Sequence, residues 1–186
     1  MPSLADSLEL LRPRLLRYAR LQLRNEAWAE DTVSETLLAA LEKPGAFAER
    51  SQPATWLIGI LKHKIVDQLR RRAREVSLDQ ADDDDGEALE NALFDASGHF
   101  IERPADWGNP EASLGQRQFI EVLDACVEKL PERLGRVFMM REWLELETDE
   151  ICKQLSITTT NLGVMLHRAR LRLRECLQLN WFGSRI

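Results

Sequence analysis

Apolar residues recur at spacings of three and four along most of this chain, and that repeat places them on one face of an α-helix. The segments with this spacing are residues 8–23, 27–42, 53–72, 114–130, 131–144 and 159–179. Only seven prolines and nine glycines occur among 186 residues, and 44% of the residues are hydrophobic. Helix-forming residues therefore dominate, and enough apolar side chains are present to fill packed cores. We predict an all-α protein.

Charge divides the chain into three parts, although the net charge is only -6. Residues 1–75 hold 13 basic and 10 acidic side chains, and residues 116–186 hold 11 and 10. Residues 76–115 hold one basic and 11 acidic side chains, including a run from Asp82 to Asp85. Two mildly basic segments thus flank a strongly acidic one, so the average charge does not exclude nucleic-acid binding by the flanks.

The acidic part also contains several glycines and prolines after the aspartates. Like charges repel and these residues interrupt helices, so the acidic part is predicted to be a linker. We expect a helical domain over residues 1–75, an acidic linker over 76–112 and a second helical domain over 113–186. Within the linker, a short helical turn is predicted between Leu89 and Phe94. The linker side chains suited to docking are Leu89, Leu93, Phe94, Phe100 and Trp107.

The three cysteines, Cys126, Cys152 and Cys176, are widely spaced, and their number is odd. This pattern does not match a disulfide framework or the closely spaced ligands of a zinc site. We expect three reduced and mostly buried thiols, and neither a metal nor another cofactor. No nucleophile paired with a base stands out in the sequence, which therefore does not favour an enzyme.

The sequence shows no segment that would cross a membrane, because no apolar run approaches the roughly 18 residues that a span needs. The N-terminus lacks an uninterrupted apolar stretch followed by a small-residue cleavage site, so it does not resemble a signal peptide. We expect a cytoplasmic protein without membrane insertion.

Residues 148–179 carry the pattern of a DNA-binding motif. Thr148 is predicted to cap a short helix over residues 149–155, which has two acids in its first turn. A tight turn follows at Ser156, and a long amphipathic helix starts at Thr159 or Thr160. A short helix, a tight turn and a second helix form the helix-turn-helix arrangement, whose second helix enters the major groove of DNA.

Several strings in both predicted domains resemble one known family. Residues 29–40 read AEDTVSETLLAA, and residues 54–72 read ATWLIGILKHKIVDQLRRR. Residues 130–175 begin with LPERLGRVF and end with LHRARLRLRE. In this order the strings resemble the extracytoplasmic-function (ECF) sigma factors of the sigma-70 family. The resemblance implies two small helical domains, a sigma region 2 bundle and a sigma region 4 helix-turn-helix, joined by the acidic linker.

The resemblance also implies function: a subunit that directs bacterial core RNA polymerase to promoter DNA and melts the -10 element, without being an enzyme itself. Stress response and an anti-sigma partner are expected on the same ground. The resemblance assigns core-polymerase binding to Glu30, Asp31 and Glu35. It assigns the -10 element to Trp56, Lys62, His63, Lys64, Arg70, Arg71 and Arg72, with the loop 45–52 holding an extruded base. It assigns the -35 element to Thr159, Thr160, Asn161, Met165, Arg168 and Arg170. For Trp56 itself we favour a place in the core over a base-stacking role, because Leu57, Ile60 and Leu61 share its surroundings.

The expected reading helix departs from the family pattern. Gly163 and Met165 stand where family members commonly carry lysine and arginine, and Ser156 replaces the usual turn glycine. Without those two cations, polar residues at the helix start must read the bases, and asparagine suits adenine edges. If the leucines of this helix face the core, the helical spacing turns Asn161 outward.

Two other functions stay open at the level of sequence. A transcription regulator with a helix-turn-helix output domain would account for the C-terminal third, but it leaves residues 29–40 and 54–72 unexplained. Such a regulator would bind DNA alone, whereas a sigma factor needs core polymerase. A helical metal- or redox-sensing enzyme could use the three cysteines and the histidines, and one bound metal per purified chain would favour it.

Overall fold

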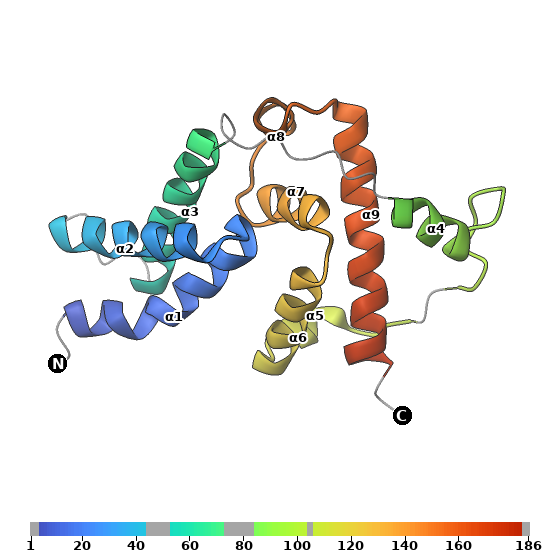
Figure 1. Cartoon of the computed structure of the whole chain (residues 1–186). Helices are drawn as coiled ribbons and strands as arrows, with labels where there is room; N and C mark the ends of the chain where they lie inside the picture. The colour runs from blue at the N-terminus through green and yellow to red at the C-terminus, as the bar shows by residue number, and fades with distance from the viewer. Residues whose placement is uncertain (1–3, 44–52, 73–83, 104–105, 184–186) are drawn as a thin grey trace. The chain divides into compact units, whose positions relative to one another are not determined.

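The computed structural model describes residues 4–43, 53–72, 84–103 and 106–183 (Figure 1). The helices are α1 (Leu4–Leu23), α2 (Glu26–Glu42), α3 (Pro53–Arg72), α4 (Asp84–Leu93), α5 (Pro110–Leu114), α6 (Arg117–Glu128), α7 (Glu132–Glu142), α8 (Thr148–Leu155), α9 (Thr159–Leu177) and the π-helical turn η2 (Gln178–Phe182). The described residues contain no strand, and one isolated antiparallel bridge joins Phe94 to Phe100. The prediction of an all-α protein is confirmed.

The chain divides into two compact units. The first consists of Met1–Ser77 and Met139–Thr158, and the second of Leu78–Phe138 and Thr159–Ile186. Residues 139–158, which the sequence places in the second domain, are thus counted with the first unit. One reason is a ring contact, because Tyr18 of α1 stacks on Trp143 with centroids 4.9 Å apart.

The first unit is built on a bundle of α1, α2 and α3. Leu57, Leu61 and Ile65 lie one turn apart on α3, and all three are fully buried. Leu15 of α1 and Val33 of α2 are buried with them. Burial of one such side chain stabilises the fold by about 1.5–3 kcal/mol, so the apolar spacing read from the sequence is the main source of this bundle's stability.

The turn between α1 and α2 lies where the sequence pattern breaks. Arg24 adopts a left-handed backbone conformation with φ 51°, and the Asn25 side chain accepts a hydrogen bond from the Trp28 backbone N–H at 3.0 Å. This bond satisfies one of the amide groups that a helix start leaves unpaired. Hydrogen bonding from the Arg20 guanidinium lowers the pKa of Glu26 in the first turn of α2.

The second unit is built on α6 and α9 with α5 and η2. The single helix predicted over residues 114–130 is split into α5 and α6, because the chain turns at Gly115 and Gln116. Phe119 is buried and meets Trp181 and Phe182 of η2 edge to face, with centroids 5.4 Å and 6.1 Å away. The Trp181 indole N–H donates to the Ser113 hydroxyl at 3.2 Å. The C-terminal turn therefore packs against α6 through its half-buried aromatic side chains.

The acidic segment is more structured than a linker with a single helical turn. It contains the ten-residue helix α4 and a turn in which Phe94 and Phe100 pack with ring centroids 4.5 Å apart. The Asp95 carboxylate accepts hydrogen bonds from the Ser97 hydroxyl at 2.6 Å and from the Ser97 and His99 amides. These bonds, that of the Ser97 side chain first, lower the pKa of Asp95. Much of the acidic run itself lies outside the described residues.

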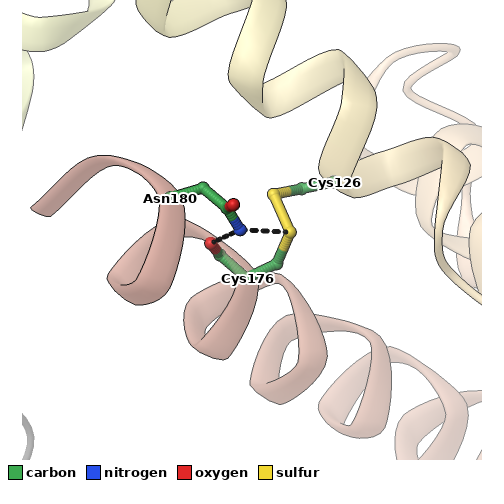
Figure 2. Close-up of a disulfide and its surroundings, with 3 residues drawn as sticks. All are labelled: Cys126, Cys176 and Asn180. Atoms are coloured by element: carbon green, nitrogen blue, oxygen red, sulfur yellow. Dashed lines mark hydrogen bonds between the residues drawn. A yellow bond between two sulfur atoms is a disulfide. The ribbon is translucent and has the colours of Figure 1, made fainter. Parts of the chain in front are cut away.

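A disulfide joins Cys126 of α6 to Cys176 of α9, as Figure 2 shows. The expectation of three reduced thiols is therefore wrong for these two cysteines, whereas Cys152 is free and half-buried. The two residues are 50 positions apart, but the packing of α6 on α9 brings their Cα atoms to 5.8 Å. Wide spacing along the chain did not reveal this, because the pairing depends on which helix faces which.

Candidate polymerase- and DNA-binding surfaces

The acidic residues expected to bind polymerase lie on the solvent-facing side of α2. Arg12 of α1 pairs with the Glu30 carboxylate at 2.8 Å, and Lys64 of α3 pairs with Glu35 at 3.3 Å. Asp31 is exposed and makes no ion pair within the described part of the chain. Glu30 and Glu35 are therefore paired with cations of neighbouring helices, whereas the Asp31 carboxylate is exposed to a partner.

Two leucines share this side of α2. The apolar spacing of residues 27–42 predicts that Leu38 and Leu41 face inward, but they are 56% and 48% exposed. Asp31, Glu35 and Leu38 are spaced by four and three residues, so they share one helix face. This spacing already placed Leu38 beside the two acids, but its apolar side chain favoured a position in the core. An exposed face that mixes acids and leucines is typical of a protein-binding surface.

The expected -10 residues of α3 differ in their partners and in their exposure to solvent. Lys62 lies over the Trp143 ring at 5.4 Å and 4.0 Å from the Glu145 carboxylate, and Arg70 pairs with Glu150. Lys62 and Lys64 are half-buried, as is Trp56, whereas His63, Arg70 and Arg71 are exposed.

Helical spacing places His63 and Arg70 opposite the buried Leu57–Ile65 face and Arg71 at its flank, where arginine side chains can meet phosphate. Arg72 is the last residue of α3, and its side chain lies outside the described part. The loop 45–52, expected to hold an extruded base, lies outside the described residues.

The turn before α9 takes the form that the helix-turn-helix reading requires. Ser156 ends α8 with φ 54° and ψ 43°, the left-handed conformation that glycine commonly supplies at a helix end. Thr148 is the first residue of α8 and not its cap, and the actual cap, Glu147, makes no side-chain hydrogen bond there. The predicted element is thus correct, and its start differs by one residue.

The first turns of α9 present polar groups to solvent. Thr159, Thr160, Asn161 and Arg170 are exposed, whereas Leu162, Leu166 and Ala169 are buried, as the spacing predicted. Met165 is only 7% exposed, so it belongs to the buried set and does not offer the apolar DNA contact that was expected. Its position beside Leu166 on the inner face explains the difference. The same outer face carries Val164 and His167, which sequence reasoning did not select.

The acidic segment covers part of α9 beyond its first turns. Glu90 of α4 accepts a hydrogen bond from the Arg168 guanidinium at 3.1 Å, and both side chains are largely shielded, with exposures of 34% and 23%. Phe94 lies beside the His167 ring, with centroids 6.2 Å apart. One of the expected DNA contacts, Arg168, is thus occupied by a carboxylate from the same chain.

Aromatic residues continue this cover toward the end of α9. The Arg174 guanidinium lies over the rings of Phe100 and Trp107, at 5.9 Å and 5.3 Å from their centroids. The Trp107 indole N–H donates to the Gln178 side-chain oxygen at 2.7 Å, and the Trp107 ring stacks on Phe182. Arg168 and Arg174 of α9 are therefore only partly open to DNA phosphates.

The described residues contain no group of three or more His, Cys, Asp or Glu arranged to hold a metal ion. In the same part of the chain, none of the helices combines the length and apolar character needed to traverse a bilayer.

Comparisons with known proteins match both parts of the chain. Residues 8–75 match the family model of sigma-70 region 2, and residues 120–173 match that of sigma-70 region 4. A probable RNA polymerase sigma factor of Haemophilus influenzae is 36% identical over 172 residues, which cover 91% of this chain and 87% of that protein. The ECF RNA polymerase sigma factor SigW of Bacillus subtilis is 23% identical over 174 residues, covering 94% and 88%.

A solved structure is also similar: the sigma factor RpoE of Bartonella quintana in complex with the anti-sigma factor NepR. The match covers 94% of this chain and 96% of that one, at 22% identity and a TM-score of 0.43.

Proposed function

Because the chain belongs to the ECF group of the sigma-70 family and is an RNA polymerase sigma factor, we propose how its surfaces divide the work of promoter recognition. The observation that carries the proposal is the exposed face of α2, where Asp31 and Glu35 lie beside Leu38 and Leu41. A polymerase subunit needs a protein-binding face apart from its DNA-reading helix, and this face of α2 meets that need.

Core polymerase is proposed to bind this face of α2. Asp31 supplies an open charge, and Leu38 and Leu41 supply apolar area that association would remove from water. Glu30 and Glu35 are already paired with Arg12 and Lys64, so they position the face and contribute less new attraction. A basic, partly apolar groove on the polymerase is the complementary surface.

Promoter DNA is proposed to meet the outer side of α3 and the first turns of α9. Arg70 and Arg71 would neutralise phosphates near the -10 element, and His63 would donate a hydrogen bond beside them, which contributes affinity without reading sequence. Thr160 and Asn161 would meet base edges of the -35 element, because they lie at the N-terminal end of the helix and point outward. The DNA backbone beside these bases would be contacted by Thr159, Arg168 and Arg170.

The remaining expectations rest on family membership. Residues 1–75, 76–112 and 113–186 are proposed as region 2, acidic linker and region 4. The chain is proposed to act in the cytoplasm, where bacterial RNA polymerase works, to catalyse no reaction of its own, and to be held by an anti-sigma protein until a stress signal releases it.

Run-off transcription with purified core polymerase on genomic fragments tests the proposal. The chain should give new transcripts, and Asp31→Arg with Glu35→Arg should abolish both these transcripts and co-purification with core. The matched control is Glu9→Arg with Glu121→Arg, which makes the same change of charge on exposed acids of α1 and α6. Undiminished binding of the Asp31/Glu35 variant, with an unchanged circular dichroism spectrum, would contradict the assignment.

A further inference from the structure

We propose that Cys126 and Cys176 form a reversible thiol modification site, which a small-molecule disulfide oxidises. In the oxidised protein the disulfide links α6 covalently to α9, the helix proposed to read DNA. The proposal rests on the proposed function in one respect, the cytoplasmic location. Disulfides in bacterial cytoplasm are usually transient and redox-sensing, because the thiol pools there are reducing. A disulfide in this place therefore points to regulation.

The backbone already holds the two cysteines at bonding distance. Their Cα atoms are 5.8 Å apart, within the usual range for disulfides, so the packing of α6 on α9 accommodates the bond. Cys126 is 2% exposed, whereas Cys176 is half-buried. The Asn180 amide donates to the Cys176 carbonyl at 2.7 Å and lies 3.5 Å from its sulfur, as Figure 2 shows. Cys176 is thus the more exposed of the two residues.

A cavity of about 240 Å³ opens onto the pair. Its walls carry both cysteines together with Leu89, Lys129, Arg172 and Glu175. Lysine and arginine near a thiol favour the thiolate, which is the nucleophile in disulfide exchange. The cavity thus offers a small reagent access to the pair from a wall that carries two cations and one carboxylate.

The reaction balances as a two-electron exchange. The Cys176 thiolate attacks one sulfur of the small-molecule disulfide R–S–S–R, forms a mixed disulfide and releases R–S⁻. The Cys126 thiolate then attacks the Cys176 sulfur and releases the second R–S⁻. Both released thiolates take up the protons lost by the cysteines, so two protein thiols are oxidised and R–S–S–R is reduced to two R–SH.

The consequence lies in the stability of the unit that carries α9. The bond closes a loop of 50 residues between α6 and α9 and so restricts the unfolded chain. Oxidation should therefore extend the temperature range over which α9 stays packed on α6. Cys152 provides an internal comparison, because it is a free cysteine in the other compact unit.

Thiol trapping tests the chemistry without polymerase or DNA, so its outcome is independent of the proposed function. The full chain is equilibrated in buffers of reduced and oxidised glutathione, alkylated and analysed by mass spectrometry. Cys126 and Cys176 should pass together from alkylated to linked as the oxidised share rises, while Cys152 stays alkylated. A pair that stays alkylated in oxidised glutathione, or linked in reduced glutathione, would overturn the proposal.

Thermal unfolding tests the consequence. The oxidised chain should melt at least about 5 °C above the reduced chain, given the loop length and the size of the unit. Cys152→Ser should keep this difference, and Cys126→Ser with Cys176→Ser should remove it. Equal melting temperatures of oxidised and reduced wild type, with the disulfide verified by mass, would overturn the stabilising role.

Discussion

The two compact units of this protein are held together by different kinds of contact. In the first, α1, α2 and α3 follow one another in sequence and pack through leucines one helical turn apart. In the second, the closing contacts join distant residues: the Cys126–Cys176 disulfide, the Trp107–Phe182 stack and the Glu90–Arg168 pair. The helical bundle of the first unit thus depends on apolar periodicity along three consecutive helices. The second unit adds a covalent bond and aromatic and ionic contacts between residues far apart in the sequence.

The largest effect is expected in the core of the first unit. Leu61→Ala should lower the free energy of unfolding by about 2–5 kcal/mol, because Leu61 is fully buried and the change leaves a cavity. Urea denaturation followed by circular dichroism measures this loss, which should be the same with and without reductant. Leu10→Ala is the control, since Leu10 is 79% exposed and should cost less than about 0.5 kcal/mol. A loss that appeared only in reductant would contradict the comparison.

A smaller effect is expected at the start of α9 in the second unit. Asn161→Ala should weaken holoenzyme binding to the preferred -35 sequence by about 1–3 kcal/mol, the range for one good base contact. It should weaken binding to a scrambled element far less, because phosphate contacts do not depend on sequence. Binding series on promoter variants measure both values. Equal losses on both elements would show that Asn161 does not read bases.

The link between the acidic segment and α9 should oppose DNA binding. Glu90→Gln removes the charge that occupies Arg168, so affinity for -35 DNA should rise by about 2- to 10-fold at low salt, as expected for one partly shielded ion pair. Fluorescence anisotropy of a promoter duplex titrated with holoenzyme measures the change. Glu111→Gln, an equal charge change at an exposed site, should leave affinity within twofold. Equal gains for both variants would assign the effect to net charge alone.

The smallest effect is expected at the turn before α9. Ser156 holds a left-handed backbone conformation that costs a side-chain-bearing residue about 1 kcal/mol. Ser156→Gly should therefore stabilise the chain by up to about 1 kcal/mol, since glycine adopts this conformation freely although it loses more entropy on folding. Thermal unfolding measures the gain. Destabilisation by Ser156→Gly would mean that the serine side chain contributes more than its backbone costs.

The sequence by itself determined the helices and the motifs. Spacings of three and four predicted α1, α2 and α3, the break at Asn25 and the turn at Ser156, because these depend on interactions within a few residues. The outward position of Asn161 and the inward position of Leu162 and Leu166 followed from the same local geometry. Family resemblance in both parts of the chain was also carried by contiguous strings of residues.

Only the tertiary structure decided which surfaces meet. Leu38 and Leu41 are exposed and Met165 is buried, because helical spacing gives a face but not the neighbour that covers it. The disulfide between Cys126 and Cys176 and the pair between Glu90 and Arg168 join residues 50 and 78 positions apart. Such contacts form only after helices pack, and their energies depend on distance and burial, which one-dimensional spacing does not contain.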